Sequence, residues 1–320
     1  MSDDGGLRIA TRSSELALRQ ARLVADALAA RGTPSTLVTF KTTGDRNTDK
    51  PLGAIGAKGL FTHELEHALL KGRVDCCVHS LKDLPTEMPA GLAIAAVLER
   101  EDPRDVLVVN DAIAAEGLAD LPRGSRVGTS SLRRRAQLRH ARADLEVVEL
   151  RGNVPTRLHK VDDGQLHAAI LAAAGLHRLG VRQRIDAYLE PPGWLPAPGQ
   201  GAIAVQVRAD DDAVRVLIAS LNHAATSCAT RAERAFLAAL EGGCQVPIGA
   251  LVVEQDGGGV LHGMLSDVAG ARVLRGAAVV DPAHPEHAGA RLAEELRQEG
   301  ADEILAGLRG EEGVPAPQPE

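Results

Sequence analysis

A turn rich in glycine and hydroxyl side chains, followed by two arginines, could bind an anion. It follows a strand predicted at residues 126–128 and opens a helix with both arginines in its first turn. The pattern comprises Gly128, Thr129, Ser130, Ser131, Arg133 and Arg134. Free backbone N–H groups and the helix dipole favour a negative charge at such a helix start. A guanidinium group can also donate two parallel hydrogen bonds to the oxygens of one carboxylate or phosphate. Ordinary N-capping by Ser130 or Ser131 would explain the hydroxyls equally well.

Basic and hydroxyl side chains also follow other predicted strands. They are Arg12, Ser80, Lys82, Arg151 and, one turn into the next helix, Arg157. Ligands of open α/β sheets bind at the carboxyl ends of the strands. Several cations gathered there predict a small-molecule substrate that carries several carboxylates or phosphates. Because the sequence has no G-x-x-x-x-G-K-[ST] pattern, a nucleotide is the weaker expectation.

Asp83 lies within this cationic group, directly after Lys82. Neighbouring cations should keep its carboxyl group ionised, which suits the stabilisation of a developing positive charge. A helix cap or a structural ion pair explains its position equally well.

Cys244 occupies a glycine-bounded turn between a predicted helix and a predicted strand, whereas Cys76 and Cys77 fall inside a strand pattern and Cys228 on an apolar helix face. An accessible backbone setting is the one expected of a reactive or modified thiol. A small buried cysteine at a tight turn is the other explanation.

The segment His63-Glu-Leu-Glu-His67 matches the H-E-x-x-H zinc pattern in a predicted helix. Arg73 stands where the longer metzincin pattern has its third histidine, and a predicted strand and a proline-bounded loop separate Glu87 from the motif. We therefore expect no metal site and interpret the motif as an exposed helix face.

Short apolar runs alternate with helical patterns over the first 210 residues. Strands are predicted at residues 7–11, 36–40, 75–79, 92–97, 106–109, 126–128, 146–150, 168–171 and 202–207. This alternation predicts α/β units with mostly parallel sheets. From residue 211, two helical patterns, three β-like runs (250–253, 260–265 and 272–280) and a helical segment at 286–308, interrupted at Gly300, predict a smaller α+β unit.

The basic charge is concentrated and consists mainly of arginine. Of 36 basic residues 30 are arginine, and residues 123–160 contain ten basic against three acidic side chains, although the whole chain carries −7. Anion binding and a compositional bias both explain this surplus. Arg135, Arg139 and Arg142, spaced along one helix face, are expected to be solvated.

Composition excludes several classes of protein. Five aromatic residues argue against a surface that stacks nucleic-acid bases, and no apolar run reaches the roughly 20 residues that a membrane span needs. The acidic start lacks an apolar signal region, and four cysteines form no disulfide framework. We therefore expect a cytoplasmic protein.

Together, the motifs resemble the porphobilinogen deaminase (hydroxymethylbilane synthase) family. The matching segments are Arg8-Ile-Ala-Thr-Arg12, Thr43-Gly-Asp45, Lys58-Gly-Leu-Phe61, Asp75 with His79-Ser-Leu-Lys-Asp-Leu-Pro85, Arg100-Glu-Asp-Pro-Arg104, Gly128-Thr-Ser-Ser-Leu-Arg-Arg134, Leu150-Arg-Gly-Asn-Val-Pro-Thr-Arg157, Ala174-Gly-Leu-His-Arg-Leu-Gly180, Pro198-Gly-Gln-Gly201 and Glu241-Gly-Gly-Cys-Gln-Val-Pro247. The resemblance runs from about Leu7 to Leu308 in the family's order, and the ordered set of segments is far more specific than any single one.

The resemblance implies a transferase of haem biosynthesis that joins four porphobilinogen molecules head to tail into hydroxymethylbilane, with release of ammonia. The product would grow on a dipyrromethane cofactor bound to Cys244 by a thioether. Asp83 would be the catalytic carboxylate, which stabilises the cation left by deamination. The other cofactor-binding residues would be Ser80, Lys82, Thr129, Ser130, Ser131, Arg133, Arg134 and Arg151, and the substrate-binding residues would be Arg12, Ser14, Arg157, Arg178 and Gln200.

The resemblance also implies two α/β domains like a type II periplasmic binding protein with a hinge, and a smaller C-terminal α+β domain. Domain 1 would comprise residues 1–100 completed by 200–220, domain 2 residues 101–199, and domain 3 residues 221–310 with the cofactor cysteine. Residues 41–59 would act as a mobile lid. The proline-rich composition of residues 311–320 predicts a disordered tail. We expect a monomer whose partners are porphobilinogen and the growing polypyrrole, with neither nucleic acid nor membrane.

Two other classes of function stay open at this stage. A non-catalytic, two-lobed binding protein for a polyanionic small molecule would explain the hinge and the arginines, but would carry no covalent group on Cys244 and would not need Asp83. A zinc hydrolase would lose its activity together with its metal.

Overall fold

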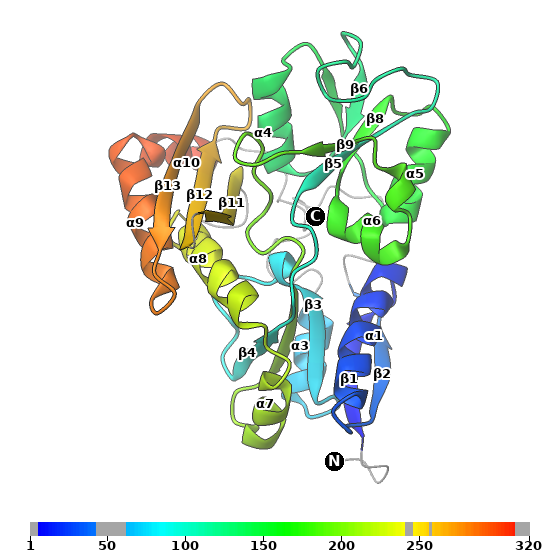
Figure 1. The fold of residues 1–320 in the computed structure, drawn as a ribbon, viewed down its shortest axis with the longest axis vertical. Helices are drawn as coiled ribbons and strands as arrows, with labels where there is room; N and C mark the ends of the chain where they lie inside the picture. The colour runs from blue at the N-terminus through cyan, green and yellow to red at the C-terminus, as the bar shows by residue number, and fades with distance from the viewer. Residues whose placement is uncertain (1–5, 43–61, 241–245, 256–257, 311–320) are drawn as a thin grey trace.

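The computed structural model describes residues 6–42, 62–240, 246–255 and 258–310. They form two α/β lobes, one above the other, and a smaller C-terminal unit beside them (Figure 1). Among these described residues, no helix is long and apolar enough to cross a membrane. Cys244, the segments 43–45 and 58–61, nearly all of the expected lid and the tail lie outside the described residues.

The first lobe is a five-stranded sheet covered by helices on both faces. Its strands, in order across the sheet, are β2 (Ser35–Phe40), β1 (Leu7–Arg12), β3 (Cys76–Ser80), β10 (Ile203–Arg208) and β4 (Leu92–Val97). Its helices are α1 (Glu15–Ala29), α3 (His63–Leu70) and α7 (Asp212–Ala219). Neighbouring strand residues point to opposite faces, so Cys76 packs in the cluster with α1 and α7 while Cys77 packs in the cluster with α3.

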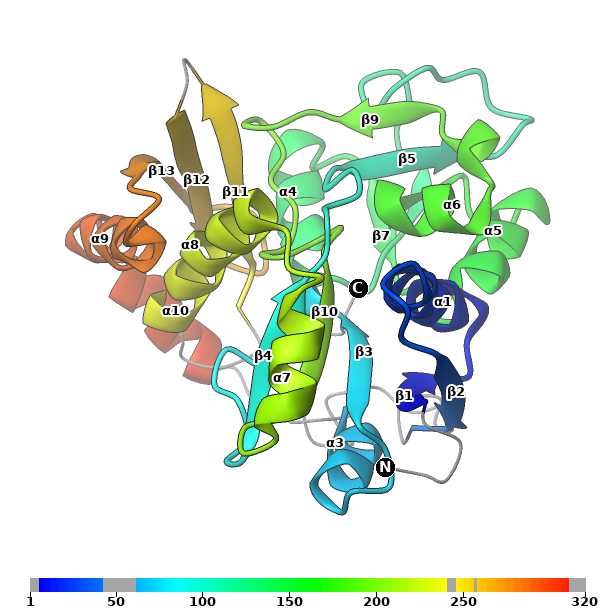
Figure 2. The same cartoon turned by 60° about the horizontal axis from the view of Figure 1, so that its bottom comes forward.

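The second lobe repeats this plan. Its sheet has the order β7 (Glu146–Val148), β6 (Arg126–Gly128), β8 (Ala168–Ala172), β5 (Asp105–Val109) and β9 (Ala187–Leu189). Its helices are α4 (Leu132–Ala141), α5 (Val154–Asp162) and α6 (Ala173–Leu179), followed by the 3₁₀ turn η3 (Arg182–Arg184). Helix α6 contacts α1 of the first lobe (Figure 2).

The C-terminal unit is an antiparallel sheet packed against helices. Its strands are β11 (Ile248–Gln255), β12 (Gly258–Ser266) and β13 (Val273–Val280), and its helices are α8 (Ala224–Leu240), α9 (Pro285–Gln298) and α10 (Ala301–Gly310). A single apolar cluster joins all three helices to the sheet, with Phe236, Leu292 and Leu305 among its buried members. The predicted α+β unit, including the helix break at Gly300, is confirmed.

The prediction of mostly parallel sheets is wrong, because each lobe has two parallel and two antiparallel strand pairs. Strand β10 runs antiparallel to β3 and β4, and β5 runs antiparallel to β8 and β9. Both strands follow directly on a segment that crosses from the other lobe, so they enter their sheets from the interlobe end, where Ile203 pairs with Ser80. The strand β9 was not predicted from the sequence.

Two crossover segments connect the lobes and lie side by side. They are residues 98–104 and 190–202. The backbone N–H of Glu101 donates to the Gly201 carbonyl at 3.1 Å, and Arg100 Nε donates to the Gln200 carbonyl at 2.8 Å. Gly201 has a φ of +87°, and a Cβ there would lie 2.3 Å from the Glu101 carbonyl oxygen. Only glycine therefore allows the two segments to approach so closely.

Helix α8 docks the C-terminal unit on these crossovers through Glu233, whose side chain is completely buried. Its carboxylate accepts hydrogen bonds from Arg100 Nη1 and Nη2 at 2.6 and 3.0 Å, from the Gly199 backbone N–H at 2.7 Å and from the Val252 backbone N–H at 3.0 Å. One carboxylate thus joins both crossovers to the C-terminal sheet.

We expect the substitution Arg100→Lys to lower the free energy of unfolding by about 1–3 kcal/mol, because lysine keeps the charge but cannot form two parallel bonds to Glu233. The matched control is Arg231→Lys, on the same helix as Glu233. Arg231 pairs with Glu286, both about half exposed (52% and 45%), so we expect at most about 1 kcal/mol there. Urea denaturation measures both changes, and equal losses at the two positions would contradict this role of Arg100.

Of the arginines expected to be solvated along this helix face, Arg139 is exposed, but Arg135 and Arg142 are partly buried. Arg142 donates to the carbonyls of Leu118, Ala119 and Leu121 and pairs with Asp144 at 2.8 Å. Arg139 donates to the Val268 carbonyl at 3.2 Å. Arg142 therefore stabilises the loop before β6, and Arg139 links the second lobe to the C-terminal unit.

Candidate functional site

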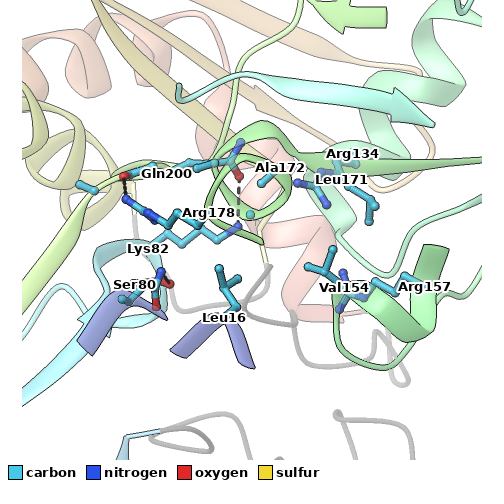
Figure 3. A pocket seen from close by; sticks show the side chains of 15 residues that line it. Leu16, Ser80, Lys82, Arg134, Val154, Arg157, Leu171, Ala172, Arg178 and Gln200 are labelled. Atoms are coloured by element: carbon cyan, nitrogen blue, oxygen red, sulfur yellow. Dashed lines mark hydrogen bonds between the residues drawn. The ribbon is translucent and has the colours of Figure 1, made fainter. Parts of the chain in front are cut away.

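A pocket lies between the two lobes, where the carboxyl ends of β3 and β8 face each other (Figure 3). The lining residues are Leu16, Gln20, Ser80, Lys82, Arg134, Val154, Arg157, Leu171, Ala172, Ala174, Gly175, Arg178, Gln200, Gly201 and Ala202. Four of these are cations, and none is an aspartate or a glutamate. Such a lining suits a ligand with several carboxylate or phosphate groups.

The first lobe contributes the end of β3 and the 3₁₀ turn η2 (Leu81–Asp83) that follows it. The amide nitrogen of Gln20, from α1, donates to the Ser80 hydroxyl at 2.8 Å. Lys82 Nζ donates to Gln200 Oε1 at 3.1 Å, which ties the turn to the second crossover. Asp83 ends this turn directly after Lys82, and its Oδ1 atom is shielded from solvent.

The second lobe contributes one arginine from each of its three helices. Arg134 comes from α4, Arg157 from α5 and Arg178 from α6. Arg134 and Arg157 lie across the pocket from Ser80 and Lys82, whereas Arg178 is drawn beside Lys82 (Figure 3). Arg178 Nη2 donates to the Gly201 carbonyl at 2.6 Å. Burial lowers the pKa of Arg178 to about 10, although the negative charge of Glu101 acts to raise it. This guanidinium is therefore still charged at neutral pH.

Asp105 is a polar residue of the site region that sequence reasoning missed. Its fully buried carboxylate accepts hydrogen bonds from Arg133 Nη1 at 2.6 Å, Arg134 Nη2 at 2.8 Å, Trp194 Nε1 at 2.8 Å and Gln200 Nε2 at 2.8 Å. Burial alone would raise the pKa of Asp105, but the two arginines outweigh it and hold that pKa far below its ordinary range. One buried negative charge therefore balances one of two adjacent guanidinium charges.

Gln200 connects this buried group to the first lobe. Its amide nitrogen donates to Asp105 and, at 2.7 Å, to the Pro103 carbonyl, while its oxygen accepts from Lys82. Three partners occupy the side chain, which is completely buried. Gln200 therefore links Lys82 of the first lobe to the buried Asp105 of the second.

The hydroxyls before α4 have local structural partners. Ser131 caps α4 by accepting from the Arg134 backbone N–H at 3.4 Å, and Thr129 Oγ1 accepts from the Ser131 N–H at 3.2 Å. Ser130 exchanges hydrogen bonds with the Leu150 backbone in both directions. The capping explanation therefore holds for Ser131.

The structure brings together six of the residues that we expected in the site, namely Ser80, Lys82, Arg134, Arg157, Arg178 and Gln200. It places eight others outside the pocket lining: Arg12, Ser14, Asp83, Thr129, Ser130, Ser131, Arg133 and Arg151. Ser14 caps α1 by accepting from the Ala17 backbone N–H at 3.4 Å. Gln20 and Asp105 were missed because their role depends on contacts with residues 60 and 95 positions away in sequence.

The two histidines of the H-E-x-x-H pattern lie together on α3. The ring centroids of His63 and His67 are 6.5 Å apart. Within the part of the chain that the structure describes, no group of three or more histidine, cysteine, aspartate or glutamate side chains could hold a metal ion.

Comparison with known proteins gives one consistent answer. The family model described as the dipyromethane cofactor binding domain of porphobilinogen deaminase matches residues 7–216, and that of the porphobilinogen deaminase C-terminal domain matches residues 227–298. The chain is 52% identical to the porphobilinogen deaminase of Moorella thermoacetica over 96% of this chain and 98% of that protein. It is 48% identical to the porphobilinogen deaminase of Syntrophobacter fumaroxidans over 94% of this chain and 97% of that protein.

Two solved structures are among those similar to part of this chain. The methionine binding protein MetQ has a TM-score of 0.44 and 14% identity, and covers 68% of this chain and 90% of its own. The VFT2 domain of Bordetella pertussis BvgS has a TM-score of 0.44 and 17% identity, and its match covers 69% of this chain and 88% of that domain's chain.

Proposed function

Because the chain belongs to the porphobilinogen deaminase family, we propose that the pocket between its lobes is where porphobilinogen is condensed, with Asp83 as the catalytic carboxylate. The chain is a transferase that joins four porphobilinogen molecules head to tail into hydroxymethylbilane and releases ammonia at each step. Its dipyrromethane cofactor is held, in this proposal, by a thioether to Cys244.

The observation that carries the proposal is the charge of the pocket lining, four cations and no carboxylate. Porphobilinogen bears an acetate and a propionate, and dipyrromethane bears the same groups on each of its two rings. The pocket therefore fits this cofactor chemically. When bound, the cofactor supplies the ring carbon to which the first porphobilinogen is joined.

Cofactor binding is assigned to residues of both lobes. Lys82 and Arg134 line the pocket from opposite lobes, so together they can hold carboxylates of one molecule from two sides. We assign Ser80, Thr129, Ser130, Ser131, Arg133 and Arg151 to the same task.

Asp83 acts on the charge that develops during the reaction. As ammonia leaves the aminomethyl group of porphobilinogen, positive charge spreads over the substrate's pyrrole ring. A carboxylate shielded from solvent stabilises that charge more strongly than water does. The same oxygen atoms can accept the proton that the attacking ring carbon loses after the new C–C bond forms.

The remaining cations recognise the substrate side chains. We assign acetate and propionate binding to Arg157 and Arg178, which line the pocket, and to Arg12 and Ser14 at the end of β1. Gln200, expected to line the cleft as a substrate ligand, supports this set by holding Lys82.

We expect Arg157→Gln to raise the KM for porphobilinogen by about tenfold or more with little change in kcat, because a charge-assisted bond to a carboxylate contributes roughly 1.5–3 kcal/mol. Steady-state kinetics measure the change. Arg126→Gln is the control, since Arg126 is exposed at the opposite end of β6 from the α4 turn. A wild-type KM in Arg157→Gln would remove Arg157 from the substrate site.

The activity itself is tested by counting products. The purified chain should release one ammonia for each porphobilinogen consumed and form one linear tetrapyrrole for every four. A chain that bound porphobilinogen without releasing ammonia would be a binding protein and would refute the proposal.

The domain division is also a proposal, with residues 1–100 and 200–220, 101–199 and 221–310 as the three domains. It is supported by β10, which lies between β3 and β4 in the first sheet although it follows the whole second lobe in sequence.

A further inference from the structure

Arg234 of α8 reaches out of the C-terminal unit to the backbone that follows Asp83. Its Nη1 donates to the Leu84 carbonyl at 3.2 Å, and its Nη2 donates to the carbonyls of Pro85 and Thr86 at 2.6 and 3.3 Å. Three consecutive carbonyl groups of the first lobe thus share one guanidinium group from another part of the chain.

The segment that Arg234 contacts has little other support from regular secondary structure. Residues 84–86 belong to neither a helix nor a strand, and Pro85 has no backbone N–H to donate. Backbone carbonyls withdrawn from water need donors, and a planar guanidinium can supply several at once. On its other side, Leu84 packs with Leu81 in an apolar cluster of the first lobe. The turn carrying Asp83 is therefore held between this cluster and Arg234.

The neighbouring residue fixes the helix that carries Arg234. Glu233 binds Arg100 and the Gly199 backbone on the two crossovers, and α8 also contacts β4 of the first lobe (Figure 2). A guanidinium that projects from a helix anchored in this way has a defined position. It can therefore hold the backbone of residues 84–86 in a fixed position.

We propose that Arg234 is a positioning residue for Asp83: it fixes the backbone of residues 84–86, and thereby the turn that carries the catalytic carboxylate, against the C-terminal unit. The inference rests on the role of Asp83 in the proposed function. It assigns Arg234 no contact with substrate, so loss of Arg234 should affect the chemical step rather than substrate binding.

The experiment compares Arg234→Gln and Arg234→Lys with Arg231→Gln. Arg231 lies on the same helix but pairs with Glu286 inside the C-terminal unit, which makes it a matched control. We expect Arg234→Gln to lower kcat by about tenfold to a hundredfold, the scale of a misplacement near 1 Å, with KM within about twofold. Arg234→Lys should recover part of kcat, because an ammonium can still donate to one or two of the carbonyls. Arg231→Gln should match the wild type.

The remaining outcomes decide against the inference. A wild-type kcat in Arg234→Gln would overturn it, as would a raised KM with unchanged kcat, or loss of the cofactor from the purified variant by intact mass. If Arg234→Gln does not fold, Arg234→Lys carries the test, and its kcat must fall below that of Arg231→Lys. Asp83→Asn is measured in parallel. If that variant is fully active the proposed function of Asp83 fails, whereas an impaired Asp83→Asn beside a normal Arg234→Gln refutes the inference alone.

Discussion

Asp83→Asn should lower kcat by about 10²–10⁴-fold while the chain stays folded. Asparagine has the same shape, but it neither stabilises a cation through a full negative charge nor accepts a proton. Steady-state and single-turnover kinetics with porphobilinogen measure the loss. The effect should fall on kcat more than on KM, because the developing charge exists mainly in the transition state.

The matched control for this variant is Glu87→Gln. Glu87 is an exposed carboxylate four residues further along the same loop, and its removal changes the local charge equally. We expect wild-type kinetics there. If both variants lost activity to the same extent, general electrostatics would explain the loss and Asp83 would have no special role.

Asp105→Asn should produce the largest loss of stability, about 3–5 kcal/mol in the free energy of unfolding. Removing the carboxylate leaves Arg133 and Arg134 buried without their shared counter-charge, and a buried cation that loses its partner is costly. Urea denaturation measures the change. The control is Asp111→Asn, an exposed residue of the same lobe, where we expect a change within about 0.5 kcal/mol.

The pH dependence gives this prediction a definite sign. The pKa of Asp105 is lowered in the folded chain. Its contribution to the free energy of unfolding is therefore fully present above the ordinary carboxyl pKa of about 4, and it is lost as the pH falls below that value toward the pKa of the folded state. The stability difference between wild type and Asp105→Asn should stay constant from about pH 5 to 8 and shrink below about pH 4. A difference that grew on acidification would contradict the assignment.

A double variant separates charge balance from packing. Asp105→Asn combined with Arg133→Gln leaves one guanidinium beside a neutral group, so it should be more stable than Asp105→Asn alone. Contacts this close are expected to be non-additive. Strict additivity of the two changes would show that the charges do not interact.

The sequence was most informative where the pattern is local. The start of α4, with Ser131 as its cap, and the helix break at Gly300 follow from residues within a few positions, and both are confirmed. The clustering of cations also follows from local information, since the carboxyl ends of strands meet at one edge of a sheet. Four of the side chains expected from the strand ends line one pocket, namely Ser80, Lys82, Arg134 and Arg157. Arg178 and Gln200, which line it too, were expected only from the family resemblance.

The features that escaped prediction depend on distant contacts. Asp105 follows a crossover and reads as the first residue of a buried strand, and nothing near it in sequence shows that two arginines and Trp194 converge on its carboxylate. The direction of β5 and β10 depends on how the chain passes between lobes. Arg142 was expected in solvent because its carbonyl partners lie more than 20 residues away.

The central claim is that this chain builds its product on a cofactor attached to Cys244, and intact mass spectrometry tests it most directly. The purified wild-type chain should exceed its sequence mass by one two-pyrrole group. Brief exposure to porphobilinogen should add a ladder of heavier species, each larger by one porphobilinogen less ammonia. Cys244→Ser should appear at its sequence mass and form no ladder. An active wild-type chain at its bare sequence mass, or an adduct retained by Cys244→Ser, would contradict the claim.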